Sequence, residues 1–164
     1  MKKILRYIAI FLLGAFITIQ FIRPKKNKQE GEAVNHISNV FAIPEDVNII
    51  LKKGCYDCHS NNTRYPWYSN IQPVAWWHAD HINEGKKGIN FSEYASYNLR
   101  KKYHKMEEVI DEVKEGKMPI KSYKRIHKDA RLSEDEKNKL IGWANTIMDT
   151  MEARYPIDSL IKKK

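Results

Sequence analysis

The only two cysteines of this 164-residue chain lie three residues apart and are followed directly by a histidine, in the pattern Cys55-x-x-Cys58-His59. The pattern fits four kinds of site: a disulfide, a corner of a zinc site, a thiol redox pair, or a covalent attachment site for haem. Each kind of site requires a different fold around it. This short stretch therefore constrains the chain more than any other.

The spacing of the motif and its surroundings separate these alternatives. A disulfide between Cys55 and Cys58 would close a very small loop and constrain little of the unfolded chain. Zinc needs four ligands, and only three are local, although His78 and His81 are available to complete a site. A thioredoxin-like pair belongs at the end of a strand in an α/β fold, and strand signals are lacking. We therefore expect one haem c, with thioethers from Cys55 and Cys58 and His59 as the proximal iron ligand.

Hydrophobic periodicity predicts that the part of the chain carrying the motif is all-α. Start and stop signals favour four helices: over 44–54, over 74–85, from just after Ser92 to Gly116, and from Ser133 onward. The last begins with a capping box, S-x-x-E, formed by Ser133 and Glu136. Apolar residues at helical spacing predict the buried faces: Val47, Ile50 and Leu51; Met106, Val109, Ile110 and Val113; Leu140, Trp143, Ala144, Ile147 and Met151.

Residues 4–22 form an almost wholly apolar run, interrupted by Arg6 and Gln20. As a helix this run spans about 28 Å, close to the thickness of a bilayer core. It is longer than the apolar region of a signal peptide and has no small-x-small cleavage site. We therefore expect a single uncleaved transmembrane helix at the N-terminus.

These features divide the chain into four predicted parts: a membrane anchor over 1–26, a tether over 27–43, a haem-binding domain over 44–155 and a basic C-terminal tail over 156–164. Covalent haem attachment takes place on the outer side of the bacterial cytoplasmic membrane. The expected location is therefore the inner membrane, single-pass, with the C-terminal domain in the periplasm.

The net charge of +9 does not indicate nucleic-acid binding. Residues 1–28 contain seven Lys and Arg and no acidic residue, which leaves 22 basic and 20 acidic residues in the rest of the chain. Most of the excess charge flanks the apolar run, so no nucleic-acid partner is expected.

Met118 is the candidate for the second axial ligand of the haem iron. Gly116 is placed to end the preceding helix, and Pro119 favours an extended chain after the methionine. A haem at this position would lie among aromatic side chains, so we expect its walls to include Tyr65, Trp67, Tyr68, Trp76 and Trp77. We also expect a carbonyl near Pro66 or Pro73 to accept the ring N–H of His59.

Three stretches resemble the bacterial haem-binding domain family: 54-GCYDCHSNNTRYPWYSNIQPVAWW-77, 80-DHINEGKKGINFSEY-94 and 116-GKMPIKSYKRIHKDARLSEDEKNKL-140. The family implies haem but no particular reaction. The order of C-x-x-C-H, M-P and a final capped helix also resembles class I cytochromes c. That likeness implies a cytochrome c-like fold with Met118 as the distal ligand. His81, in the D-H-I-x-E-G stretch, is the main alternative, and further options are His78, His104 and His127.

The sequence contains no nucleophile motif, no phosphate-binding loop and no paired catalytic carboxylates. We therefore expect a single-electron carrier and not an enzyme, with membrane redox proteins or other cytochromes as partners. The alternative is a haem sensor or a peroxidase-like enzyme, in which Met118 does not bind and the iron has an open position.

Overall fold

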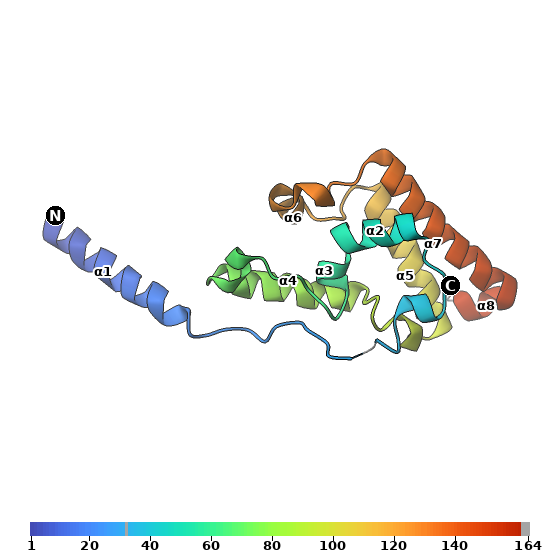
Figure 1. Cartoon of the computed structure of the whole chain (residues 1–164), viewed down its shortest axis with the longest axis horizontal. Coiled ribbons are helices and arrows are strands. Elements are labelled where there is room, and N and C mark those ends of the chain that lie inside the picture. Colours follow the sequence, from blue (N-terminus) through green and yellow to red (C-terminus); the bar gives the residue numbers. More distant parts are fainter. Residues whose placement is uncertain (32, 162–164) are drawn as a thin grey trace.

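The computed structural model describes residues 1–31 and 33–161, and over these residues it is helical without strands (Figure 1). The longer helices are α1 (Lys2–Ile19), α2 (Glu45–Gly54), α4 (Val74–Gly88), α5 (Leu99–Lys114) and α7 (Glu134–Arg154). Short helices are α3 (Tyr56–His59), α6 (Lys121–Ile126) and α8 (Ile157–Leu160). Single 3-10 turns cover Ile37–Asn39, Trp67–Asn70, Tyr94–Ser96 and Lys128–Ala130. The predicted all-α class is confirmed.

The hydrophobic core lies where α5 and α7 cross and where α2 packs on α7 (Figure 1). The faces predicted from periodicity are the ones that the structure buries: Val47, Ile50, Leu51, Met106, Ile110, Val113, Leu140, Trp143, Ala144, Ile147 and Met151, with Val109 partly buried. Each large apolar side chain removed from water contributes about 1.5–3 kcal/mol, so this cluster is the main source of stability.

The capping box at the start of α7 is present as predicted. The Ser133 hydroxyl accepts the backbone N–H of Glu136 at 3.2 Å, and the Glu136 carboxylate accepts the backbone N–H of Ser133 at 2.9 Å. The same carboxylate forms an ion pair with Lys53 near the end of α2. The start of α7 is thereby attached to the helix that leads into the C-x-x-C-H motif.

The helix that was predicted to begin after Ser92 begins instead at Leu99. Ser92 is buried, and its hydroxyl accepts the backbone N–H of Asn61 at 3.1 Å, so it does not cap a helix. Asn98 takes that role, because its side-chain oxygen accepts the backbone N–H of Lys101 at 2.8 Å. The C-terminal end is as predicted: Gly116 adopts a φ of 67° just after α5.

The segment that follows α1 runs along the domain and is hydrogen-bonded to it (Figure 1). Gln72 donates its backbone N–H to the side-chain oxygen of Gln20 at 2.9 Å. The side-chain amide of Asn27 donates to the Ser60 carbonyl at 2.8 Å, and the Asn27 carbonyl accepts the backbone N–H of Thr63 at 3.1 Å. Residues 20–27 are therefore fixed to the loop that comes directly after the motif.

Two stretches that were predicted to lie outside the haem-binding domain contribute side chains to its core. Ile37, within the predicted tether 27–43, is fully buried. Leu160, within the predicted tail 156–164, is 1% exposed in α8, which packs on α5. Residues 162–164 of that tail lie outside the described residues.

The prediction of a transmembrane anchor, and of an inner-membrane location with a periplasmic domain, is corrected by the structure. Among the described residues, no helix is both long enough and apolar enough to cross a membrane. Helix α1 ends at Ile19, three residues before the apolar run does, and Lys2, Lys3 and Arg6 all lie inside it. The run in the sequence is thus longer than the helix formed from it, and the helix carries three positive charges.

Candidate functional site

Two adjoining cavities lie beside the motif, with volumes of about 400 and 370 Å³. Four residues line both of them: Gly54, His59, Gly88 and Met118. Cys58 lines the larger cavity and Cys55 the smaller, so the two thiols lie on opposite sides of the shared boundary. The walls are mainly apolar, with Pro119, Ile120 and Tyr123 in the larger cavity and Leu51, Phe91, Val109, Val113 and Leu140 in the smaller.

His59, the last residue of α3, is oriented by the backbone beyond α4. Its Nδ1 lies 3.1 Å from the carbonyl oxygen of Ile89, a backbone group that can only accept, so Nδ1 carries the proton. The expected carbonyl is therefore present, but it belongs to Ile89 and not to the region of Pro66 or Pro73. Burial lowers the pKa of His59, against the opposing effect of the Ile89 and Gly85 carbonyls. A neutral ring with Nδ1 occupied leaves the Nε2 lone pair free to bind a metal.

Cys55 and Cys58 are free thiols that burial keeps protonated. Cys55 is the residue between α2 and α3, and Cys58 lies within α3. Burial, with a smaller contribution from Cys58, raises the pKa of Cys55 to about 12, and burial together with Asp57 raises that of Cys58 to about 11. Redox-active thiol pairs have a lowered pKa, so the structure disfavours a thioredoxin-like role.

The structure also gives no support to a zinc site at the motif. Within residues 1–31 and 33–161, no three His, Cys, Asp or Glu side chains are grouped so that they would hold a metal ion. Cys55, Cys58 and His59 are close in sequence, but Cys58 lines one cavity and Cys55 the other. A tetrahedral site requires its ligands to converge on one point.

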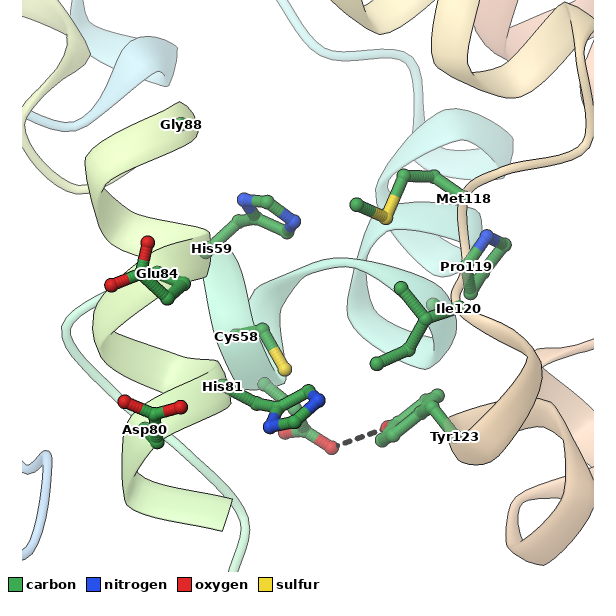
Figure 2. Close-up of a pocket in the computed structure, with 13 residues that line it drawn as sticks. Cys58, His59, Asp80, His81, Glu84, Gly88, Met118, Pro119, Ile120 and Tyr123 are labelled. Atoms are coloured by element: carbon green, nitrogen blue, oxygen red, sulfur yellow. Dashed lines mark hydrogen bonds between the residues drawn. The ribbon is translucent and has the colours of Figure 1, made fainter. Parts of the chain in front are cut away.

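Met118 lies across the cavities from His59, and the two side chains point toward each other (Figure 2). The Met118 backbone N–H donates to the Glu112 carbonyl at 3.1 Å, which holds the residue close to the end of α5. Pro119 packs against Gly54, where an added Cβ would lie 3.2 Å from the proline ring. Met118 lies between these two contacts and lines both cavities.

Of the other histidines considered as ligands, only His81 lines a cavity. It lines the larger one but not the smaller, and its Nδ1 donates to the Trp77 carbonyl at 2.8 Å. His78, His104 and His127 line neither cavity. The ring nitrogens of His104 lie 3.1 Å from the carboxylates of Glu107 and Glu108 on the exposed side of α5, and His127 bonds to the hydroxyl of Tyr68.

The aromatic loop that was expected to wall the cofactor lies outside the two cavities. None of the five expected residues lines either cavity: Tyr65, Trp67, Tyr68, Trp76 and Trp77. Trp67 is 75% exposed. The aromatic lining comes from Phe91 and from Tyr123 in α6, which both lie far from the motif in sequence.

Sequence reasoning also missed Asp57, the buried carboxylate inside the motif. It accepts the Tyr123 hydroxyl at 2.7 Å and the Arg64 side chain at 3.1–3.2 Å, together with the Arg64 backbone N–H at 3.1 Å. The bond to Asp57 raises the pKa of Arg64. The pattern C-x-x-C-H specifies no residue type at its middle positions, so nothing local marks this aspartate as a structural centre.

Gly85 is a second residue that the sequence did not single out for its role. An added Cβ at this position would lie 2.7 Å from the Cys58 carbonyl oxygen and 3.0 Å from the Cys58 Cβ. Only glycine allows α4 to pass this close to α3. The close approach fixes the helix that leads to Ile89, the acceptor for His59.

The family comparison agrees with the character of this site. A family model described as a haem-binding domain matches residues 14–146, which is most of the chain. No curated protein and no solved structure shows a significant match. The matched range includes the motif, both cavities and Met118. The chain belongs to the haem-binding domain family.

Proposed function

We propose that this chain holds one covalently attached haem c and transfers single electrons. Cys55 and Cys58 provide the thioethers, His59 is the proximal iron ligand and Met118 the distal one. The observation that carries the proposal is the opposition of His59 and Met118 at the boundary that the two cavities share (Figure 2). A flat group that extends into both cavities would be held between these two side chains, because both line both cavities.

The thiols are suited to attachment. Each S–H group would add across one vinyl group of the porphyrin: the sulfur would bond to one vinyl carbon and the other carbon would take the hydrogen, with no further reactant consumed. Cys58 lines the larger cavity and Cys55 the smaller, so each cavity has one cysteine available for attachment. Burial raises the pKa of both cysteines, so both remain S–H groups before attachment.

The two ligands favour a carrier over an enzyme. Bound haem supplies a one-electron couple at its iron. The neutral Nε2 of His59 and the thioether of Met118 would both bind the iron, which would leave no position for a substrate. Thioether ligation and apolar walls raise the reduction potential, so the partners are one-electron donors and acceptors such as other cytochromes.

The test is to express the full chain together with a cytochrome c maturation system and to assay the purified protein. We expect haem that stays with the polypeptide on a denaturing gel, a pyridine haemochrome spectrum typical of two thioethers, and no rapid change in the reduced spectrum with carbon monoxide. A colourless product would refute haem attachment. Fast carbon monoxide binding by the unmodified chain would refute the carrier and favour the sensor or peroxidase-like alternative.

A further inference from the structure

The segment that carries Met118 is anchored twice to the stretch that carries the motif. Pro119 contacts Gly54, one residue before Cys55. Tyr123, on α6, donates its hydroxyl hydrogen to the Asp57 carboxylate at 2.7 Å, between the two cysteines of the motif. Figure 2 shows this hydrogen bond at the far side of the larger cavity from Met118.

Asp57 is a rigid acceptor for this bond. It is 6% exposed, and Arg64 donates to it from both its guanidinium and its backbone N–H. A buried carboxylate with several charge-assisted hydrogen bonds has little freedom to move. The position of the Tyr123 hydroxyl is therefore determined by α3 and not by α6 itself.

Tyr123 is also held on its ring face. Its ring stacks on His127 with a centroid distance of 4.2 Å and an interplanar angle of 20°, and His127 is bonded to the hydroxyl of Tyr68 at 2.6 Å. The ring stacking involves no part of the hydroxyl. A variant that lacks only the hydroxyl therefore loses the bond to Asp57 but keeps the ring stacking of Tyr123 on His127.

We propose that the Tyr123–Asp57 hydrogen bond is a positioning contact that holds Met118 opposite His59. The proposal rests on the haem function proposed above. Met118 is fixed to α5 on its N-terminal side by the bond to Glu112, and five residues later the chain is fixed to the motif by Tyr123. With both ends held, the methionine stays at the iron. Without the Tyr123 hydroxyl bond, the segment keeps only the Pro119 contact and the ring stacking, so it moves away from His59 more readily and the distal position opens to added ligands.

The test measures the affinity of the haem-loaded full chain for imidazole by absorbance titration. Tyr123→Phe removes the hydroxyl and keeps the ring, and we expect it to bind imidazole at least tenfold more tightly than the unmodified chain, equivalent to about 1.4 kcal/mol. Tyr103→Phe is the matched control, because Tyr103 also donates to a carboxylate, that of Glu152, but lines neither cavity. The control is expected to stay within twofold of the unmodified chain.

A third variant separates this proposal from the one on which it rests. If Met118 is the distal ligand, Met118→Ala tightens imidazole binding whether or not Tyr123 has a positioning role. An unchanged affinity in Met118→Ala would reject the ligand assignment. A tighter affinity in Met118→Ala, with Tyr123→Phe and Tyr103→Phe both unchanged, would reject the positioning role alone. Equal tightening in both tyrosine variants would show a general loss of stability and would also reject it.

Discussion

Gly85 and Cys58 are in such close contact that a single methyl group at Gly85 would lie 2.7 Å from the Cys58 carbonyl oxygen. The neighbouring atoms are backbone and Cβ, which cannot move aside as the tip of a flexible side chain can. The packing of α4 on α3 is therefore set by the absence of a side chain at one position. Because α4 leads to the Ile89 carbonyl, the orientation of the His59 ring depends on the same contact.

We accordingly expect Gly85→Ala to separate α3 from α4 and to destabilise the fold by about 1–3 kcal/mol, the usual cost of overpacking. Urea unfolding of the haem-loaded chain measures this. Gly142→Ala is the control, because its added Cβ meets nothing within 4 Å in α7. That control is expected to stabilise by about 0.5–1 kcal/mol. Equal stability in the two variants would contradict the close-packing account.

Gly88 offers a separate test of cofactor binding without loss of folding. It lines both cavities, and an added Cβ there meets no atom within 4 Å. Gly88→Leu is expected to fill cavity space and to reduce haem incorporation at least tenfold, whereas Gly88→Ala incorporates haem nearly normally. Haem per polypeptide, from the pyridine haemochrome assay, measures the effect. Normal incorporation in the leucine variant would mean that haem does not occupy these cavities.

Replacement of Met118 is expected to change the iron in two different ways. Met118→Ala opens the distal position, so the reduced protein binds carbon monoxide rapidly. Met118→His restores two strong ligands but lowers the reduction potential, by on the order of 0.1 V within the roughly 0.8 V that axial ligands span. His81→Ala is the comparison and is expected to change neither property. If His81→Ala opens the iron and Met118→Ala does not, the distal ligand is His81.

The acid sensitivity of the fold is expected to depend partly on Glu136. Hydrogen bonds from Lys53 and from the Ser133 backbone N–H hold the pKa of this carboxyl below its usual value. A lowered pKa in the folded state means that the unfolded state binds more protons at acid pH. The contribution is therefore complete above about pH 4.5 and is lost as the pH falls through the folded-state value.

Glu136→Gln should therefore cost about 0.5 kcal/mol near pH 7 and progressively less toward pH 3, because glutamine keeps the capping box and loses only the ion pair with Lys53. Unfolding free energies at the two pH values measure this. Glu134→Gln is the control, because Glu134 is 83% exposed in its ion pair with Lys137 and such pairs contribute little. A cost for Glu136→Gln that does not change with pH would contradict the role of the carboxylate charge.

The parts of the fold that were predictable from sequence are those fixed by local pattern. The buried faces of α2, α5 and α7 follow from apolar residues at helical spacing, and the capping box of α7 lies within four residues. The start of α5 was not predictable in this way. Ser92 and Asn98 are both good capping residues, and only the tertiary contact of Ser92 with Asn61 decides between them.

The same division applies to the site. Cys55, Cys58 and His59 form a local motif, and the M-P pair with its preceding glycine singled out Met118. The carbonyl that orients His59 and the phenol that bonds to Asp57 come from 30 and 66 residues away, and backbone carbonyls carry no sequence signal. The apolar run at the N-terminus misled for a different reason: the helix formed from it begins at Lys2 and ends at Ile19, so it includes three positive charges and leaves out Phe21 and Ile22.

The attachment of the segment after α1 has a mechanical consequence. Asn27 is bonded to Ser60 and Thr63, and the Thr63 hydroxyl donates to the Asp57 carbonyl at 2.6 Å. A pulling force applied to α1 therefore reaches the loop beside the C-x-x-C-H motif before it reaches the core between α5 and α7. Tension on the N-terminal helix is therefore transmitted first to the residues around the candidate site, through Asn27 and Thr63 to Asp57.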